Sequence, residues 1–470
     1  MQAPASVARP APYLRSRKRL IACCDGTWLD STMGLMNKKI PIPSNVTRIS
    51  HAIKAKSSDG IPQIVFYQPG VGTEGGFISK AVGGATGEGL SGNIRETYSF
   101  LAQNYSNGDE IFLLGFSRGA FTARSVAGLI GNAGLLTKSG LPDLAEVFKD
   151  FQHRRNPNYV PANPDIPFPR KPSASDPMYR ETLEREGLTR LGINIKVIGV
   201  WDTVGALGIP RVGWLSRFGL QDQTTKEYRF YDTSLSSCIE NAYQALALDE
   251  NRTAFSPAVW EKPQGNTTNL RQVWFPGVHS NIGGGYPDQG MANITLAWMM
   301  SQLTPFIDFD PDYILDAYDE TKLHYKETEQ KPRPWSFGKI YNSLKGVYLL
   351  DGPTTRTPGM YCRIDPNTGQ ATSKPLRQTN EYIHPSARTR LELDGPGKDD
   401  RGAYDGKALD PYKLKYEDNP SNGTRPLALW VSRSKRKGVA RKELPESPLW
   451  DKERQLLKES PKMYDYVLGV

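Results

Sequence analysis

Cysteine and histidine are scarce in this chain, which has four cysteines and five histidines among 470 residues. Cys23 and Cys24 are adjacent, a spacing that suits neither a disulfide framework nor a zinc site. Both stand in the apolar run 20–24, so we expect them to be buried strand residues of a protein in a reducing compartment. Since HExxH, CxxC and EF-hand patterns are also absent from the sequence, we expect no metal ion.

Long hydrophobic runs are absent as well, because no stretch approaches the roughly 20 apolar residues of a membrane-spanning helix. Hydrophobic residues make up 38% of the chain and the mean hydropathy is −0.52, which is typical of a soluble protein with a large core. The first residues carry prolines and basic residues but no apolar segment of signal-peptide length. We therefore interpret residues 1–17 as a disordered basic arm and expect a cytoplasmic protein.

Basic residues exceed acidic ones only slightly, and the formal net charge is +9. One basic cluster stands out near the C-terminus, and its members are Arg433, Lys435, Arg436, Lys437, Arg441 and Lys442. A solvated face or tail is the simpler interpretation, and peripheral contact with an anionic membrane is the alternative. No aromatic residues interleave with the cluster, so we do not expect nucleic-acid binding.

Apolar runs and helix-like periodicities alternate over the first 305 residues, which predicts an α/β fold with a mostly parallel sheet and helices on both faces. The runs predict strands at 20–24, 63–67, 110–116, 193–201 and 271–275 and helices at 45–56, 90–105, 120–129, 238–248 and 292–303. Irregular stretches at about 141–190 and 206–237 are expected to be cap or lid insertions. We expect a catalytic domain over 18–305 and a C-terminal extension over 306–470 that packs on it.

The pentapeptide Gly115-Phe116-Ser117-Arg118-Gly119 lies between a predicted strand and a predicted helix. A G-x-S-x-G sequence in this context is typical of a nucleophile elbow, a strained turn that lifts the serine hydroxyl above the sheet edge. The alternative is a tight turn whose serine caps the following helix. Ser117 is therefore a candidate nucleophile for acyl transfer.

A serine hydroxyl is a poor nucleophile until a histidine takes its proton and a carboxylate orients that histidine. Asp202 follows the predicted strand 193–201, and His279 stands between glycines in a predicted loop after the strand 271–275. Both residues come at carboxyl ends of strands, in the chain order Ser, Asp, His. The rivals are His384 for the base and Asp249 or Asp288 for the acid.

An oxyanion hole should combine the backbone N–H of Arg118 with one from the loop that contains Gly26 and Thr27. Asp25 is interpreted either as part of this wall or as a hydrogen-bonding hub. Trp214, Leu215 and Phe218 are candidates for an acyl pocket or lid, with plain core packing as the alternative.

One motif is interpreted as a decoy. Gly87–Gly92 matches G-x-G-x-x-G and precedes a helix, but the nearest clear strand ends at Tyr67, far upstream. The dinucleotide fingerprint requires a strand directly before the glycines. We therefore expect no cofactor.

Five segments, in order, resemble the α/β-hydrolase domain family that includes the type VI secretion phospholipase effectors. They are 22–28, 67–73, 115–120, 199–205 and 275–286, with 245–250 in further agreement. Residues 384–388 resemble a C-terminal motif of fungal-type members. The resemblance implies a Ser-Asp-His hydrolase that deacylates phospholipids, with those roles on Ser117, Asp202 and His279; we do not expect the effector role to carry over.

The sequence thus predicts a serine hydrolase of carboxylic esters, of phospholipase A or lipase type. A carboxylesterase for small soluble esters is the alternative within catalysis. A catalytically silent binding module that keeps the fold is the alternative from another class.

Overall fold

The computed structural model describes residues 17–26, 42–70, 88–204, 234–365, 371–417, 427–433 and 443–469. A seven-stranded sheet lies at the centre, with strand order β11-β8-β7-β6-β3-β1-β2 and parallel pairing throughout. Its strands are β1 (Arg19–Cys24), β2 (Gln63–Gln68), β3 (Glu110–Phe116), β6 (Ile195–Trp201), β7 (Ile239–Ala247), β8 (Asn269–Phe275) and β11 (Glu381–Ile383). The predicted α/β class with a parallel sheet is confirmed.

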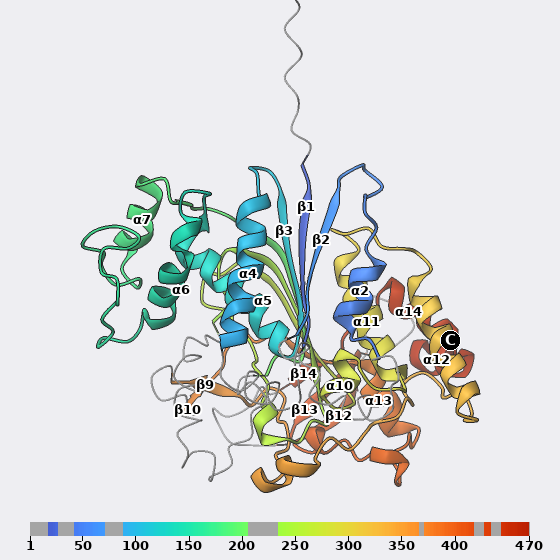
Figure 1. The fold of residues 1–470 in the computed structure, drawn as a ribbon. Helices are drawn as coiled ribbons and strands as arrows, with labels where there is room; N and C mark the ends of the chain where they lie inside the picture. The colour runs from blue at the N-terminus through green and yellow to red at the C-terminus, as the bar shows by residue number, and fades with distance from the viewer. Residues whose placement is uncertain are drawn as a thin grey trace, which may run out of the picture.

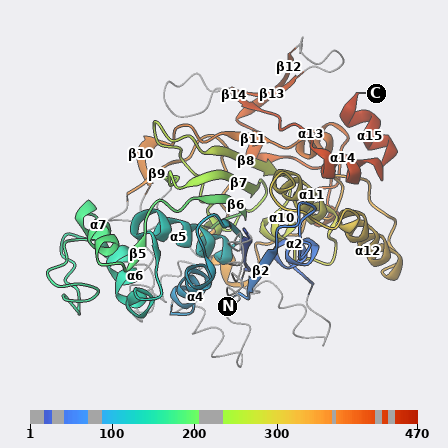
Figure 2. The same cartoon turned by 90° about the horizontal axis from the view of Figure 1, so that it is seen from above.

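Helices cover both faces of this sheet (Figures 1 and 2). One layer contains α4 (Glu88–Asn104), α5 (Arg118–Ala133) and α6 (Leu144–His153). The opposite layer contains α2 (Asn45–Ala52), α11 (Gly290–Leu303), α12 (Tyr313–Glu327) and α14 (Asp451–Lys458). Along β1, Leu20 and Ala22 belong to the first core, and Ile21 and Cys23 to the second. Burial on both faces explains why the central strands read as continuous apolar runs.

The helix predicted over 238–248 is wrong, because this segment forms β7. Its sequence contains Ala, Glu, Gln and Leu, which are good helix formers. In the fold, however, β7 pairs with β6 on one side and β8 on the other, and most of its residues are buried. Ladder pairing and burial between two strands outweigh the weak local preference for helix.

Two element boundaries near the sheet edge also differ from prediction. The helix predicted over 45–56 ends at Ala52, because Ile53 is extended and bridges to Phe309. His279, predicted to lie in a loop, instead begins the short helix α10 (His279–Gly283). The histidine is thus held by a helical turn.

The stretch predicted as the first insertion contains α6 and α7 (Pro177–Arg185), which pack beside α5 (Figure 1). Of the second stretch, 206–237, only Ser234 onward belongs to the described residues. The chain then enters β7.

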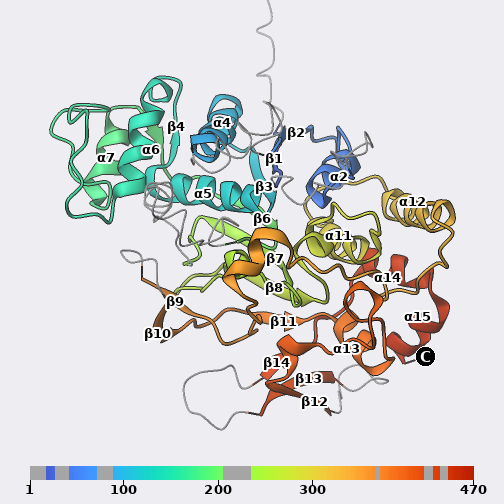
Figure 3. The same ribbon diagram turned by 60° about the horizontal axis from the view of Figure 1, so that its bottom comes forward.

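The part of the chain after residue 305 joins the sheet through β11, which pairs with β8. Helix α14 packs on α11. A three-stranded antiparallel sheet contacts β11 (Figure 3). The elements of this part include η3 (Gly346–Asp351), β9 (Cys362–Ile364), β10 (Ala371–Pro375), α13 (Pro385–Glu392), β12 (Tyr412–Glu417), β13 (Leu427–Ser432), β14 (Glu443–Pro445) and α15 (Pro461–Leu468). Two short strands elsewhere, β4 (Leu135–Leu136) and β5 (Thr189–Arg190), form a separate pair.

Cys23 and Cys24 are fully buried in β1, as predicted. Within the described ranges, no helix combines the length and the apolar character needed to cross a bilayer.

Candidate active site

Ser117 lies at the turn between β3 and α5, the position predicted from the pentapeptide. Its backbone has φ 56° and ψ −120°, a strained conformation for a residue with a Cβ, which costs about 1–3 kcal/mol. The flanking glycines are required by close backbone contacts. A Cβ on Gly115 would lie 2.5 Å from the Gly119 carbonyl oxygen, and one on Gly119 would lie 2.0 Å from the carbonyl oxygen of Cys24.

Asp202 and His279 form a buried hydrogen-bonded pair. Asp202 follows β6 directly, and its Oδ2 lies 2.6 Å from Nδ1 of His279. The side chains are 0% and 4% exposed. The imidazole contacts two aromatic rings, with centroid distances of 4.6 Å to Phe116 and 4.9 Å to Phe255. These contacts restrict rotation of the imidazole.

Backbone contacts bring Ser117 to the same sheet edge as this pair. The Ser117 N–H donates to the carbonyl of Trp201, the residue before Asp202, at 3.1 Å. Helix α10 is pressed against the end of β3, since a Cβ on Gly283 would lie 2.0 Å from the Phe116 ring. Among the described residues, the Ser117 hydroxyl makes no hydrogen bond, to His279 or to any other group.

A buried arginine that the sequence analysis did not single out pairs with Asp202. Arg356 donates from Nη1 to Oδ1 at 2.5 Å and from Nη2 to Oδ2 at 3.0 Å, and the N–H of Ala247 donates to Oδ1 at 3.0 Å. Burial acts to raise the pKa of Asp202, but the charge of Arg356 and the bond to His279 outweigh it and lower the pKa well below its usual range. The carboxylate is therefore ionised at neutral pH.

Glu250 anchors the start of α10. Its Oε2 accepts the backbone N–H of His279 at 3.2 Å and pairs with Arg252 at 3.0 Å. Burial acts to raise the pKa of Glu250, but the Arg252 guanidinium dominates and lowers it to about 2. Arg252 in turn stacks over the ring of Phe255, which contacts the imidazole. A buried ion pair thus supports both the backbone and one aromatic wall of His279.

Of the predicted oxyanion residues, Gly26 and Arg118 lie close to Ser117. Gly26 is buried against the elbow, since a Cβ there would lie 3.0 Å from the Ser117 Cβ. Its N–H donates to Oδ1 of Asp25 at 2.6 Å. Arg118 begins α5, and Thr27 lies outside the described residues.

Asp25 is a hydrogen-bonding hub, one of the two interpretations from the sequence. Its Oδ2 accepts from the hydroxyls of Ser44, Thr47 and Tyr67 at 2.7, 2.8 and 2.7 Å. Burial raises the pKa of this carboxyl above its usual value. Asp25 ties the end of β1 to the start of α2 and the end of β2.

The rival acids and the rival base form hydrogen bonds with residues other than Ser117, Asp202 and His279. Asp249 accepts the Gly277 N–H and the Tyr404 hydroxyl, and Asp288 accepts the Tyr325 hydroxyl. His384 is fully buried, and both of its ring nitrogens are engaged, with Ser386 and Glu453 at 2.7 Å each. Of the candidates, only Asp202 and His279 bind one another.

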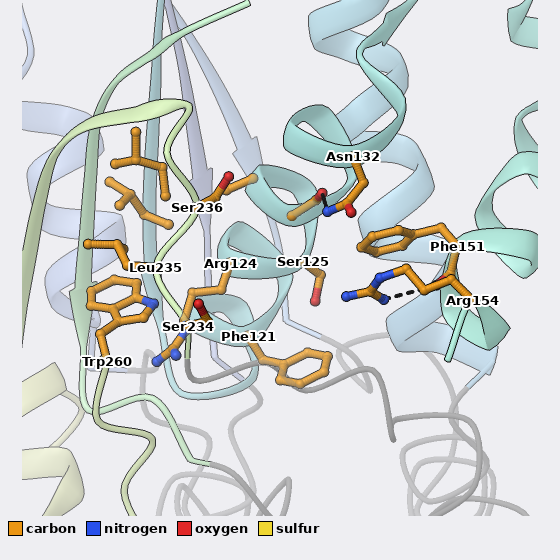
Figure 4. A pocket seen from close by; sticks show the side chains of 14 residues that line it. Phe121, Arg124, Ser125, Asn132, Phe151, Arg154, Ser234, Leu235, Ser236 and Trp260 are labelled. Carbon is orange, nitrogen blue, oxygen red and sulfur yellow. Dashed lines mark hydrogen bonds between the residues drawn. The ribbon is translucent and has the colours of Figure 1, made fainter. Parts of the chain in front are cut away.

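A cavity of about 150 Å³ lies along α5 (Figure 4), and neither Asp202 nor His279 is among the described residues that line it. Arg124 lies beside Trp260 on one side, and Arg154 beside Phe151 on the other. No carboxylate is among the described residues that line it. The predicted acyl-pocket residues Trp214, Leu215 and Phe218 lie outside the described residues. The described ranges also hold no cluster of three or more His, Cys, Asp or Glu side chains arranged for a metal ion.

Comparison with known proteins gives one family over more than half of the chain. The family model for the catalytic domain of Tle1-like phospholipase effectors of type VI secretion systems (T6SS) matches residues 18–302. Uncharacterized protein YEL023C of Saccharomyces cerevisiae is 26% identical over 264 residues, which cover 52% of this chain and 33% of the yeast protein. The match therefore spans about a third of that relative's length.

A solved structure of an uncharacterized protein from Pseudomonas aeruginosa is 17% identical, with a TM-score of 0.33. The alignment covers 68% of this chain and 52% of the bacterial one. A similarity this low supports no argument about function.

Proposed function

Because the chain belongs to the Tle1-like phospholipase effector catalytic-domain family, we propose that it is a serine hydrolase that cleaves the carboxylic esters of phospholipids. The observation that carries the proposal is the buried Asp202–His279 bond at the sheet edge where the strained turn holds Ser117. An oriented imidazole beside a strained serine is the arrangement that acyl transfer requires.

In the proposed reaction, His279 takes the hydroxyl proton of Ser117 at Nε2 while the serine oxygen attacks the acyl carbon. Nδ1 keeps its proton in the bond to Asp202, so Nε2 is the basic nitrogen of the neutral ring. The imidazolium that forms is stabilised by the ionised carboxylate. It then gives its proton to the leaving alcohol, which departs as a lysophospholipid and leaves an acyl-enzyme.

Hydrolysis of the acyl-enzyme reverses these roles. His279 takes a proton from water, the hydroxide oxygen attacks the acyl carbon, and Ser117 leaves with the proton returned by the imidazolium. The products are a fatty acid and the free enzyme. Two rings contact the imidazole, so its rotation is restricted through both half-reactions.

The negative charge on the tetrahedral intermediate needs backbone donors. We propose the Arg118 N–H as the first donor, because the residue after the serine begins α5. The second donor belongs to the loop after β1. In this structure the Gly26 N–H is bonded to Asp25, so Thr27 is the better candidate, or Gly26 after it exchanges its partner.

An activity panel with the matched variant Ser117→Ala tests the proposal. Long-chain phospholipid vesicles and short soluble p-nitrophenyl esters are each given to wild type and variant. The proposal predicts fatty-acid release from vesicles by wild type and none above background by the variant. Preference for short esters without a gain at an interface would favour the small-ester carboxylesterase. No turnover and no labelling by a fluorophosphonate would favour the silent binding module.

A cytoplasmic location and contact of the basic residues 433–442 with an anionic membrane remain part of this proposal. Only Arg433 of that cluster is among the described residues. Vesicles with and without anionic lipid test the contact, since basic residues add about 1 kcal/mol each near such a surface.

A further inference from the structure

We infer that Arg356 is a positioning residue that holds the acid of the active site in its working orientation. The inference rests on the proposed function, because it concerns the same Ser117, Asp202 and His279. Arg356 lies 154 positions after Asp202 and outside the region matched by the family model. The C-terminal part of the chain thus contributes a side chain to the centre of the catalytic domain.

The guanidinium of Arg356 is held by four acceptors at once. Its two terminal nitrogens bind the two oxygens of Asp202, at 2.5 and 3.0 Å. They also donate to the backbone carbonyls of Ala247 at 2.9 Å and Phe255 at 2.7 Å. Only arginine has a planar fork that satisfies such a set. The Arg356 side chain is 3% exposed, so solvent screens the pair little.

These bonds determine which oxygen meets the imidazole. Oδ1 of Asp202 is occupied by Arg356 and by the Ala247 N–H, while Oδ2 binds Arg356 and Nδ1 of His279. Rotation of the carboxylate would break four bonds in a buried site. The carboxylate plane, and with it the tautomer and orientation of His279, is therefore set from the C-terminal part of the chain.

Arg356 also balances charge around the base. Within the described ranges, the charged groups beside His279 are two acids and two cations, namely Asp202, Glu250, Arg252 and Arg356. Without Arg356 the acids beside the imidazole outnumber the cations, and the buried Asp202 carboxylate loses the charge and the two-point contact that hold it.

The test compares Arg356→Met and Arg356→Lys with the control Arg388→Met. Arg388 also lies in the C-terminal part and makes a buried two-point pair with a carboxylate, Glu446, at 2.8 and 3.2 Å. It contacts none of the proposed catalytic residues. For folded protein, checked by circular dichroism, we expect Arg356→Met to lower kcat about 10- to 100-fold with KM within about threefold.

The lysine variant keeps the charge but not the fork. We expect it to lower kcat about 5- to 10-fold. Arg388→Met should keep kcat within about twofold. Should the methionine variant fail to fold, the lysine variant decides the question: wild-type kcat in Arg356→Lys would overturn the inference.

A double-mutant cycle separates positioning from a general structural role. If Arg356 acts through Asp202, adding Arg356→Met to Asp202→Asn should change kcat less than about twofold. A full 10- to 100-fold further loss in the Asn background would show that Arg356 acts elsewhere and would overturn the inference. Activity that survives Ser117→Ala would instead overturn the proposed function, so the two failures are distinguishable.

Discussion

The structure contains two buried groups of a serine, a histidine and an acid, and they differ in what is left for a substrate. In one, Asp202 binds Nδ1 of His279, and the described residues offer no hydrogen bond to the other ring nitrogen. In the other, Ser386 and Glu453 occupy both nitrogens of His384. A serine, a histidine and an acid thus occur twice: once with a ring nitrogen that the described residues do not bond, and once with both ring nitrogens bonded.

The backbone of the two serines differs as well. Ser117 has a positive φ of 56° at the carboxyl edge of the sheet, whereas Ser386 lies in the first turn of α13. His384 caps that helix by accepting the Ser386 N–H at 3.1 Å. The second set therefore caps the start of a helix in the core. On the proposed function, a ring nitrogen without a hydrogen bond among the described residues and strain at the serine, more than residue type, distinguish the Ser117 set from the Ser386 set.

The largest expected difference is between the two serines. Ser117→Ala should lower kcat for phospholipid hydrolysis about 10⁴-fold or more, because the attacking atom is gone. Ser386→Ala should keep kcat within about twofold and lower only stability, because its hydroxyl bonds inside the core. Fatty-acid release from vesicles measures both. Loss of activity in folded Ser386→Ala protein would contradict this expected difference between the two serines.

The two histidines should separate next. His279→Ala should lower kcat about 10³- to 10⁴-fold while the protein stays folded. His384→Ala should keep kcat but reduce the free energy of unfolding by about 2–4 kcal/mol, because it leaves a cavity and removes the hydrogen-bond partner of the buried Glu453 Oε1. Urea denaturation and initial rates on the same preparations measure the two effects. Equal losses of activity in the two variants would contradict the distinction between the set around His279 and the set around His384.

Substitution of two glycines in α5 tests the role of the strained turn at Ser117. A methyl at Gly119 would meet the Cys24 carbonyl oxygen at 2.0 Å, whereas one at Gly128 would meet the Phe151 ring at 3.4 Å. Gly119→Ala should therefore displace the turn, with a loss of about 3 kcal/mol or more and of most activity. Gly128→Ala should change stability by less than about 1 kcal/mol and leave kcat unchanged. Thermal unfolding and rates compare them.

The smallest effect concerns the acids around the two histidines. The pKa of Glu250 is lowered to about 2, so its contribution to stability is complete above its ordinary pKa and is lost as the pH falls toward 2. From pH 6 to 3 this loss amounts to about 2 kcal/mol, and Glu250→Gln should remove it.

Burial raises the pKa of Glu453 well above its usual value, so its contribution has the opposite sign: stability falls as the pH rises above the ordinary pKa. Glu453→Gln is therefore the matched variant and should not flatten the acid loss. Free energies from urea titrations at pH 3 to 7 measure both slopes. A slope in Glu250→Gln identical to that of wild type would contradict the role of the Glu250–Arg252 pair.

The sequence predicts the parts of the fold and site that depend on local patterns. Two-sided burial makes β1, β3, β6 and β8 readable as apolar runs, and the pattern around Ser117 predicts its strand-to-helix context. The segment 238–248 is misread because Ala, Glu and Gln favour helix, and only pairing with β6 and β8 makes it a strand.

No local sequence pattern predicts that Arg356 pairs with Asp202. Arg356 is one of 59 basic residues and reaches Asp202 only through the packing of the C-terminal part. His384 shows the converse limit, since it is a rival base in the sequence analysis and both of its ring nitrogens are bonded in the fold. Long-range contacts, which the sequence pattern does not encode locally, decide both.

Mapping the residue modified by a fluorophosphonate shows whether Ser117 is the nucleophile, because the reagent requires a serine activated by a neighbouring base. The reacted protein is digested and the phosphonylated peptide is sequenced by mass spectrometry. We expect one modified residue, Ser117, and loss of this modification in His279→Ala but not in His384→Ala. Modification at Ser386, or labelling that survives His279→Ala unchanged, would contradict this expectation.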